Sequence, residues 1–229
     1  MDTALNAIAK SVRTFMRWPA QFLDRISGGR ITPNQVTLVS LLGHFTVIWA
    51  LWKDRPILGA ILLIFFGIMD TLDGALAKLQ KRASLKGMLY DAVSDRVKEV
   101  LVYVGVMIYL DGGGVYLSNS VSSGIHDWYT NVAFVSPYTI IVAVCGLSLV
   151  VSYIKAKGEM ALSSTGNYNA QKLNRVFSDG FARYEVRMAL IVLGLLTGNL
   201  LLILHVLVAL LIFTSLQRIF RVSKALGDA

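Results

Sequence analysis

The chain has 229 residues, of which 55% are hydrophobic, and its formal net charge at pH 7 is +8. This composition is too apolar for an ordinary soluble domain and indicates an integral membrane protein. The positive charge alone could suggest a nucleic-acid-binding protein, but basic residues beside anionic lipid head groups explain it better. The single cysteine, Cys145, excludes an intrachain disulfide and a multi-cysteine metal site.

The first 30 residues predict a helix that lies on the inner membrane surface. From residue 4 to residue 26, apolar side chains recur at roughly helical spacing, with basic residues elsewhere on the helix. A peripheral tail that only packs against the protein is the alternative. The stretch has no continuous apolar core, so no cleavable signal peptide is predicted. Ser27-Gly28-Gly29 should end this helix, and Thr32 and Pro33 should cap and begin the next.

Six apolar stretches follow, and we expect each of them to cross the membrane. Several are shorter than the roughly 20 residues that a bilayer requires, so helix ends with functional polar residues would supply the remaining length. We therefore predict an all-α integral membrane protein with a juxtamembrane amphipathic helix (1–30) and a six-helix domain (31–229). The stretches are Val36–Trp52, Ile57–Met69, Val97–Leu110, Val135–Ile154, Met188–Leu196 and Leu200–Phe213.

Basic residues predict the orientation of these spans. Of the 22 lysines and arginines, only Lys53 and Arg55 fall in loops expected on the outer side. The positive-inside rule then places both termini in the cytoplasm. We expect a multi-pass protein of the cell (inner) membrane. The polar connection 158–182, whose structure the sequence does not predict, lies on the same cytoplasmic side.

Four aspartates stand in one short part of this apolar chain. Asp70 and Asp73 are spaced i, i+3, and Asp91 and Asp95 are spaced i, i+4, so each pair shares one face of a helix. A carboxylate at membrane depth costs on the order of 2.5–3.5 kcal/mol on insertion scales, so such residues usually mark a site. Four hard oxygen donors on adjacent helices indicate a divalent cation, or a pair of them, at the cytoplasmic face.

Two simpler explanations stand beside the metal site. The aspartates could cap helices or form ion pairs with Lys78, Arg96 or Lys98. The small residues beside them, Gly74, Ala77 and Gly87, could serve helix packing alone instead of admitting a ligand. Four carboxylates in register on two helices favour the metal site.

The stretch resembles the signature of the CDP-alcohol phosphotransferases. In that signature two aspartates, a glycine and a small residue with a basic neighbour are followed by a glycine and two more aspartates at fixed spacing. Lys78 departs from it, because it replaces an arginine and loses bidentate phosphate geometry. The matching positions are Asp70, Asp73, Gly74, Ala77, Lys78, Gly87, Asp91 and Asp95.

The resemblance implies a two-metal transferase. Two Mg²⁺ ions (or Mn²⁺) would be held by the four aspartates, with Asp70 and Asp91 bridging both ions, Asp73 serving one and Asp95 the other. Asp95 would also take the proton from the acceptor hydroxyl, which attacks the β-phosphorus of a CDP-lipid such as CDP-diacylglycerol and releases CMP.

The resemblance also implies the nucleotide site. The CDP group would lie against Gly74, Ala77 and Gly87, with contacts from Lys78 and Ser84 to its phosphates or ribose. The Thr-Pro-Asn start of the first span recurs in the family, so Pro33 and Asn34 could line the same pocket. For Asn34, a simple helix-start role is the alternative.

The acceptor follows from a second resemblance. Residues 152–159 are similar to a stretch of the phosphatidylinositol-phosphate synthase branch, which uses inositol 1-phosphate. Lys155, Arg187 and Arg218 are candidates to bind its phosphate, unless they are only inner-leaflet anchors. Gly158 departs from the branch, so glycerol 3-phosphate, and hence a phosphatidylglycerol-phosphate synthase, stays open.

A cation-coupled transporter is the alternative from another functional class. Carboxylates within a membrane can form a cation relay. The aspartates, however, cluster at predicted helix ends instead of the midplane, and the sequence shows no inverted repeat. The family resemblance further implies a homodimer, and no nucleic-acid partner is expected.

Overall fold

The structure, a computed structural model, describes residues 16–112, 136–166, 177 and 181–227. Within these residues the regular secondary structure is helical and no strand occurs, so the all-α expectation is confirmed. The chain divides into two compact units, Met1–Ile108 and Tyr109–Ala229. Most of the predicted surface helix 4–26 lies outside the described residues, as does most of the polar connection 158–182.

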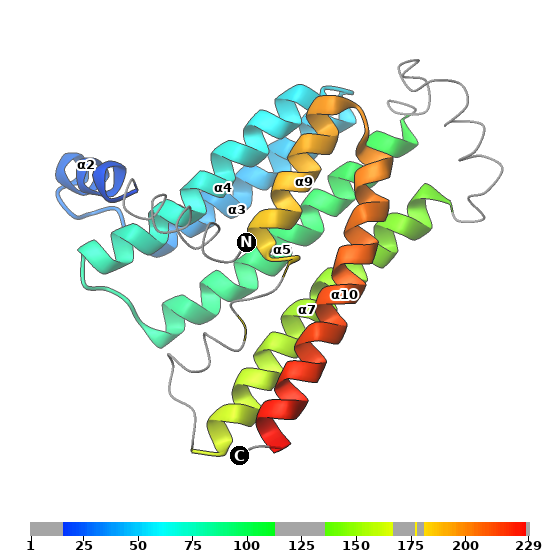
Figure 1. The fold of residues 1–229 in the computed structure, drawn as a ribbon. Helices are drawn as coiled ribbons and strands as arrows, with labels where there is room; N and C mark the ends of the chain where they lie inside the picture. The colour runs from blue at the N-terminus through cyan, green and yellow to red at the C-terminus, as the bar shows by residue number, and fades with distance from the viewer. Residues whose placement is uncertain (1–15, 113–135, 167–176, 178–180, 228–229) are drawn as a thin grey trace. The chain divides into compact units, whose positions relative to one another are not determined.

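From residue 16 on, the first unit contains three complete helices and most of a fourth. They are α2 (Arg17–Ser27), α3 (Pro33–Trp52), α4 (Pro56–Leu79) and α5 (Leu85–Asp111), the last of which continues into the second unit. Figure 1 shows α3 and α4 side by side. The predicted boundary between α2 and α3 is confirmed in detail. Gly28 ends α2 in the left-handed region at φ 58°, and Thr32 caps α3 in a reciprocal capping box with Gln35.

Glycines let the helices of the first unit approach closely. A Cβ atom placed on Gly43 of α3 would lie 2.0 Å from the Phe66 ring of α4. A Cβ on Gly105 of α5 would lie 3.3 Å from the Cα of Ile48 on α3. Close backbone approach of this kind is how helices associate where lipid removes the hydrophobic drive between them.

One side chain links the end of α4 to α2 and to the segment between α2 and α3. Gln80, just after α4, donates from Nε2 to Asp24 of α2 at 2.8 Å and to the backbone oxygen of Ile31 at 2.9 Å. This amide therefore holds α2 and the start of α3 against the cytoplasmic-side end predicted for α4.

The outer faces of α3 and α4 are apolar and their inner faces carry polar groups. On α3, exposed apolar side chains recur at i, i+4, i+7, i+11 and i+14, from Leu38 to Trp52. The buried face of the same helix carries Thr37, Ser40 and His44. This arrangement, apolar outside and polar inside, is typical of a helix that faces lipid on one side and a polar site on the other.

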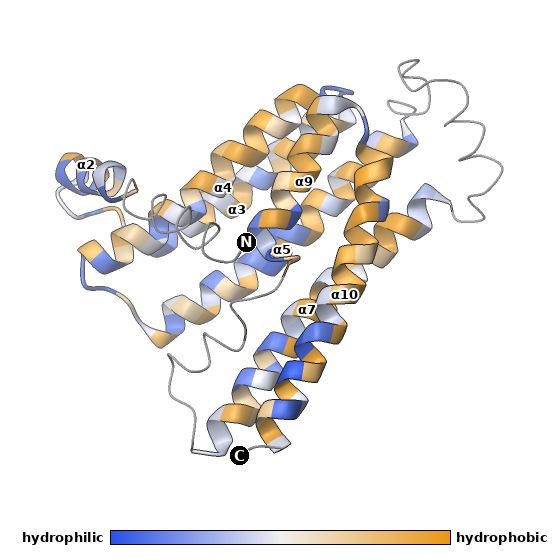
Figure 2. Cartoon of the chain, viewed as in Figure 1, coloured by the Kyte–Doolittle hydropathy of each residue, from blue (hydrophilic) through white to orange (hydrophobic). Residues whose placement is uncertain are grey.

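The second unit is built from α7 (Pro137–Ser164), α9 (Tyr184–Thr197) and α10 (Leu200–Gly227). A Cβ on Gly158 of α7 would meet Val222 of α10 at 2.9 Å, and one on Gly194 of α9 would meet Leu200 of α10 at 2.9 Å. Figure 2 shows hydrophilic residues gathered in the C-terminal halves of α7 and α10. Helix α7 extends about three turns beyond the predicted apolar run that ended at Ile154.

Among the residues that the structure describes, four helices are long and apolar enough to cross a membrane: α3, α4, α7 and α10. Helix α9 has 14 residues, about 21 Å of helix, and is shorter than the hydrocarbon core of roughly 30 Å. The count of six spans and the placement of both termini in the cytoplasm therefore stay predictions.

Replacing Gly43 by alanine should destabilise the first unit. The added methyl group must displace the Phe66 ring, and overpacking of this kind costs roughly 1–3 kcal/mol. Gly67→Ala is the matched control, because a Cβ there meets no atom within 4 Å and lies in the same helix pair. Thermal unfolding in detergent should show a lower midpoint for Gly43→Ala only. Equal midpoints for both variants would contradict the close packing of α3 on α4.

Candidate functional site

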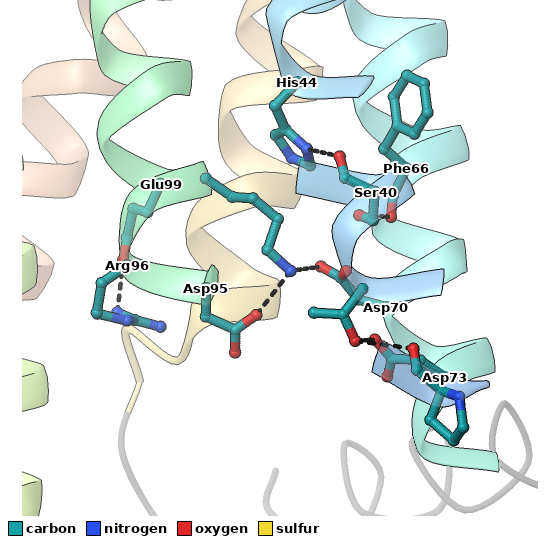
Figure 3. Close-up of polar contacts among 11 residues, drawn as sticks. Ser40, His44, Phe66, Asp70, Asp73, Asp95, Arg96 and Glu99 are labelled. Atoms are coloured by element: carbon teal, nitrogen blue, oxygen red, sulfur yellow. Dashed lines mark hydrogen bonds and ion pairs between the residues drawn. The ribbon is translucent and has the colours of Figure 1, made fainter. Parts of the chain in front are cut away.

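The aspartates of the motif lie where α4 ends and α5 begins. One lysine joins them: the Lys98 ammonium on α5 is 2.6 Å from Oδ2 of Asp70 on α4 and 3.0 Å from Oδ1 of Asp95 on its own helix. The Lys98 side chain is 0% exposed, against 13% for Asp70 and 28% for Asp95. Figure 3 shows the two ion pairs converging on one ammonium group. The two motif helices thus present carboxylates to a shared cation.

The sequence left open whether the aspartates form ion pairs with basic residues, and the contacts of Lys98 show that two of them do. Ion pairing with Lys98 does occur for Asp70 and Asp95. Arg96 pairs instead with Glu99 at 2.5 Å, one turn further along α5 (Figure 3). These two basic residues of α5 therefore form ion pairs with different partners, Arg96 with Glu99 and Lys98 with two motif carboxylates.

Asp73 is held by the neighbouring helix. The hydroxyl of Thr37 on α3 donates to Oδ2 of Asp73 at 2.6 Å, and Asp73 is 5% exposed. The same hydroxyl lies 3.1 Å from the backbone oxygen of Pro33. A hydroxyl has only one proton to donate, and the carboxylate of Asp73 is both the closer and the stronger acceptor. Thr37 thus fixes the orientation of one of the four predicted metal ligands.

Two further polar side chains of α3 lie near the aspartates on its buried face. Ser40 donates to the backbone oxygen of Phe66 at 3.0 Å, and Nδ1 of His44 lies 2.8 Å from the backbone oxygen of Ser40 (Figure 3). Nε2 of His44 is buried and has no hydrogen-bond partner within the described part of the chain. Burial of these groups in an apolar helix indicates a polar interior beside Asp70.

The motif carboxylates provide part of a cation site. Asp70 and Asp95 already converge on a positive charge, so their geometry suits one. Asp73 has a supporting hydroxyl, and Asp91 is exposed one turn before Asp95. Among the described residues no three acidic, histidine or cysteine side chains form a group that could hold one ion. Two of the four carboxylates therefore meet at a cation, and the complete ligand set stays a prediction.

The small residues of the motif differ in their surroundings. A Cβ on Gly74 would meet no atom within 4 Å, so open space lies beside Asp73. A Cβ on Gly87 would lie 3.2 Å from Oγ of Ser84 and 3.7 Å from Oδ1 of Asn34. The predicted nucleotide residue Asn34 of α3 is thereby brought next to two others, Ser84 and Gly87 at the start of α5.

Ser84 also has a local structural role. Its hydroxyl accepts from the backbone N–H of Gly87 at 3.0 Å, which caps the start of α5. Lys78 is exposed in the last turn of α4, and Ala77 beside it is partly buried, as is Pro33 at the start of α3.

The candidate acceptor residues all lie in the second unit. Arg187 on α9 is 2% exposed and donates to the backbone oxygen of Ala182 at 2.6 Å. Arg218 on α10 is buried and donates to the backbone oxygen of Val151 on α7 at 2.8 Å. Lys155 is half exposed and lies 3.8 Å from Glu159. The backbone N–H of Ala182 donates to Thr214, one turn before Arg218, which links α9 to α10 at this level.

The chain matches one known protein family over most of its length. The model of the CDP-alcohol phosphatidyltransferase family matches residues 30–217, which include all the motif aspartates. The chain belongs to this family. The match covers α3, α4, α5, α7 and α9 completely, and most of α10.

Several family members are similar to the chain over part of its length. An archaetidylinositol phosphate synthase of Pyrococcus horikoshii is 31% identical over 34% of this chain and 42% of its own length. A phosphatidylinositol phosphate synthase of Corynebacterium glutamicum is 28% identical over 57% of this chain and 52% of its own. The matches thus span about half the length of these relatives.

A solved structure has the same fold. The Mycobacterium tuberculosis phosphatidylinositol phosphate synthase with CDP-DAG bound superposes with a TM-score of 0.65 at 20% identity, over 90% of this chain and 92% of that one. The same protein has a structure in complex with manganese and citrate. The membrane fold of the family is therefore shared by this chain, which is a multi-pass membrane protein.

Thr37 and Lys98 contact the motif aspartates, but the sequence analysis did not predict either of them as a site residue. A polar residue on the buried face of an apolar helix is the signal for Thr37, since it lies one turn before Ser40 and two before His44. Lys98 gave a weaker signal, because its three-residue spacing from Asp95 fits an exposed ion pair equally well.

Replacing Thr37 by valine should weaken divalent metal binding. Valine has nearly the same shape but cannot donate to Asp73, and loss of a group that orients a metal ligand typically costs about 10–100-fold in affinity. Titration of Mn²⁺ into the purified protein, followed by electron paramagnetic resonance of free Mn²⁺, measures the change. Thr46→Val is the control, because the Thr46 hydroxyl donates to the backbone oxygen of Gly43 within the same helix, more than two turns beyond Thr37. Unchanged Mn²⁺ affinity in Thr37→Val would contradict the prediction that Asp73, in the orientation that Thr37 holds, is a metal ligand.

Proposed function

We propose that this protein transfers a phosphatidyl or similar substituted phosphate group from a CDP-lipid, such as CDP-diacylglycerol, to the hydroxyl of a small alcohol, and releases CMP. The observation that carries the proposal is the convergence of Asp70 and Asp95 on one cation. They come from the two helices of the family motif, and family membership supplies the reaction class. Inositol 1-phosphate is the favoured acceptor.

Two divalent cations, Mg²⁺ or Mn²⁺, would neutralise the pyrophosphate of the CDP-lipid and stabilise the departing CMP. In this proposal Asp70, Asp73, Asp91 and Asp95 would hold the two ions. The manganese complex of the structural neighbour supports the use of a divalent metal. The hydroxyl of Thr37 donates to Asp73 and would keep this carboxylate oriented when a metal binds.

Asp95 has a second role as general base. It takes the proton from the acceptor hydroxyl while that oxygen bonds to the β-phosphorus. The bond from this phosphorus to the oxygen that bridges the two phosphates breaks, and the electron pair leaves with CMP. The Asp95 side chain is 28% exposed, against 13% for Asp70, which gives an acceptor room to reach it.

The nucleotide is expected to bind beside the small motif residues. The open space at Gly74 and the cluster of Asn34, Ser84 and Gly87 support this placement. Ala77 borders the same surface, and Lys78 and Ser84 would contact the phosphates or ribose. Pro33 positions Asn34 at the first turn of α3.

The acceptor assignment draws on the relatives and on the basic residues of the second unit. Several relatives are named as synthases of inositol phosphate lipids. Lys155, Arg187 and Arg218 supply the positive charge that a phosphorylated acceptor requires. Glycerol 3-phosphate is the second candidate acceptor, because Gly158 departs from the branch pattern and packs tightly against Phe177 instead.

The membrane setting of the proposal has three parts. Six spans would place both termini and the aspartates at the cytoplasmic face of the cell (inner) membrane. Helix α2, with Trp18, Phe22 and Ile26 exposed along one face, would lie in the inner leaflet as the juxtamembrane element of residues 1–30, ahead of the domain 31–229. A homodimer would complete the assembly.

The deciding experiment is a CMP-release assay in detergent with CDP-diacylglycerol and a panel of acceptors. Inositol 1-phosphate, glycerol 3-phosphate, free inositol and serine are compared, each with Mg²⁺, with Mn²⁺ and with EDTA. Acceptor-dependent and metal-dependent CMP release supports the proposal. Absence of CMP release with every acceptor would favour the cation-coupled transporter, and full turnover with EDTA would remove the two-metal mechanism.

Asp95→Asn should lower turnover by a factor of about 100 or more, because asparagine cannot accept the hydroxyl proton. Binding of CDP-diacylglycerol should largely persist, since one metal position survives. Asp70→Asn should weaken both metal and nucleotide binding, because it removes a bridging ligand. Asp54→Asn is the control for the same chemical change, on an exposed residue outside the site. An Asp95→Asn enzyme with normal turnover would contradict the assigned role.

Removing a cation from the acceptor site should raise the KM for the acceptor and leave that for CDP-diacylglycerol nearly unchanged. Each charge-assisted contact contributes roughly 1.5–3 kcal/mol, so Lys155→Met should raise the acceptor KM about tenfold or more. Arg187→Met and Arg218→Met should do the same, with added loss of stability from their buried backbone contacts. Lys157→Met removes an exposed charge from the same helix turn and serves as control.

Free inositol should be a poor substrate in the same assay, because it would leave the basic residues without a phosphate. If free inositol or serine is the better acceptor, the acceptor assignment fails and the metal site is unaffected.

A further inference from the structure

Lys98 occupies a position that the family motif does not define. It lies three residues after Asp95, the last aspartate of the motif, and its side chain is completely buried. Its ammonium nevertheless contacts carboxylates on both motif helices, at 2.6 Å and 3.0 Å. The oxygens it contacts, Oδ2 of Asp70 and Oδ1 of Asp95, belong to residues proposed here as metal ligands.

We propose that Lys98 is a tethered counter-cation that holds Asp70 and Asp95 together in the metal-free protein and is displaced from them when a divalent cation binds. Lys98 would then be a positioning residue that lowers the metal affinity of the site. This inference rests on the proposed metal dependence of the enzyme. It does not depend on which alcohol is the acceptor.

Competition follows from the charges and the distances. Mg²⁺ binds carboxylate oxygens at about 2.0–2.1 Å, so an ammonium 2.6 Å from the same oxygen would be close to a second positive charge with little water between them. The two cations therefore exclude one another at Asp70. The four-carbon stem of lysine is flexible, so the ammonium can leave without a shift of the α5 backbone.

In the absence of metal, the Lys98 ammonium stabilises the buried carboxylates. Buried carboxylates are costly unless they are paired, and Asp70 is 13% exposed. A cation attached to α5 provides that partner when no metal is bound. The pair also ties α5 to α4, which keeps the two ligands from different helices near each other.

A purely structural ion pair would make the opposite prediction for metal binding. If Lys98 only aligned α4 with α5, its removal would misplace the carboxylates and weaken metal binding. If Lys98 competes with the metal, its removal frees both carboxylates and metal binding becomes tighter. The sign of the change thus distinguishes the two roles.

The test compares Mn²⁺ affinity in wild type, Lys98→Met and Lys98→Gln, by electron paramagnetic resonance of free Mn²⁺ in detergent without substrate. Both substitutions remove the charge and keep an unbranched side chain. We expect Mn²⁺ to bind on the order of tenfold more tightly to both variants, as expected for loss of a competing charge-assisted contact. Lys86→Met removes an exposed charge from the same helix and should have little effect.

Thermal unfolding gives a second readout. In EDTA the Lys98 variants should unfold at a lower temperature than wild type, because the carboxylates lose their partner. Saturating Mg²⁺ should remove most of this difference, since a ligand that binds more tightly stabilises more. A variant recovered only in Mg²⁺ would fit the same expectation. Equal losses of stability with and without metal would indicate a structural ion pair and overturn the proposal.

A wild-type measurement keeps the proposal testable if no variant folds. Acetylation of Lys98 by an amine reagent, quantified by mass spectrometry, should rise several-fold when Mn²⁺ is added, because the displaced ammonium leaves its buried partners. Unchanged reactivity, or Mn²⁺ affinity in the variants that is equal to or weaker than wild type, would overturn the displacement. If wild type itself binds no Mn²⁺, the proposed metal mechanism fails instead.

Discussion

The burial of negative charge between apolar helices is the constraint on which the first unit depends. Asp70 and Asp73 sit at the end of a helix whose preceding residues are almost all apolar. A buried carboxylate without a partner is strongly unfavourable, so each requires a donor from a neighbour. Lys98 provides it for Asp70, and Thr37 provides it for Asp73. The donors come from α5 and α3, so these two helices must both lie close to α4.

Because Asp70 and Asp73 require donors from neighbouring helices, α3, α4 and α5 must pack closely. In lipid, apolar side chains gain little by leaving the surrounding medium, so helices associate through tight contact and polar bonds. Gly43 admits the Phe66 ring between α3 and α4, and Gly105 admits the backbone of α3 beside α5. The glycines thus bring the backbones near enough for side chains as short as threonine and aspartate to reach one another.

The sequence predicted the parts of the site that depend on local spacing. The faces shared by the aspartates, the capping of α3 by Thr32 and the end of α2 at Gly28 are set by neighbours within one or two turns, and each is confirmed. The proximity of Asn34 to Gly87 was suggested only by family resemblance, because it joins segments more than fifty residues apart in sequence. Hydropathy also placed the end of α7 too early, since the helix continues through its polar residues to Ser164.

The partners of the aspartates could not be chosen from sequence, because three basic residues were within reach on helical spacing. Arg96 and Lys98 are two positions apart on α5, and their side chains therefore point in directions about 160° apart around the helix axis. Only tertiary packing decides which of them turns toward α4. Lys98 does, and Arg96 turns toward Glu99 instead.

This choice of partner has a chemical consequence for the site. If Asp70 and Asp95 bind a metal as proposed, they must also be stable before it binds, and the Lys98 ammonium supplies that stability. The same ammonium contacts oxygens proposed as metal ligands, so stability without metal and affinity for metal would oppose each other at these two residues. The flexible stem of a lysine suits this position better than the planar, rigid fork of an arginine, which would hold a carboxylate with two bonds and release it less readily.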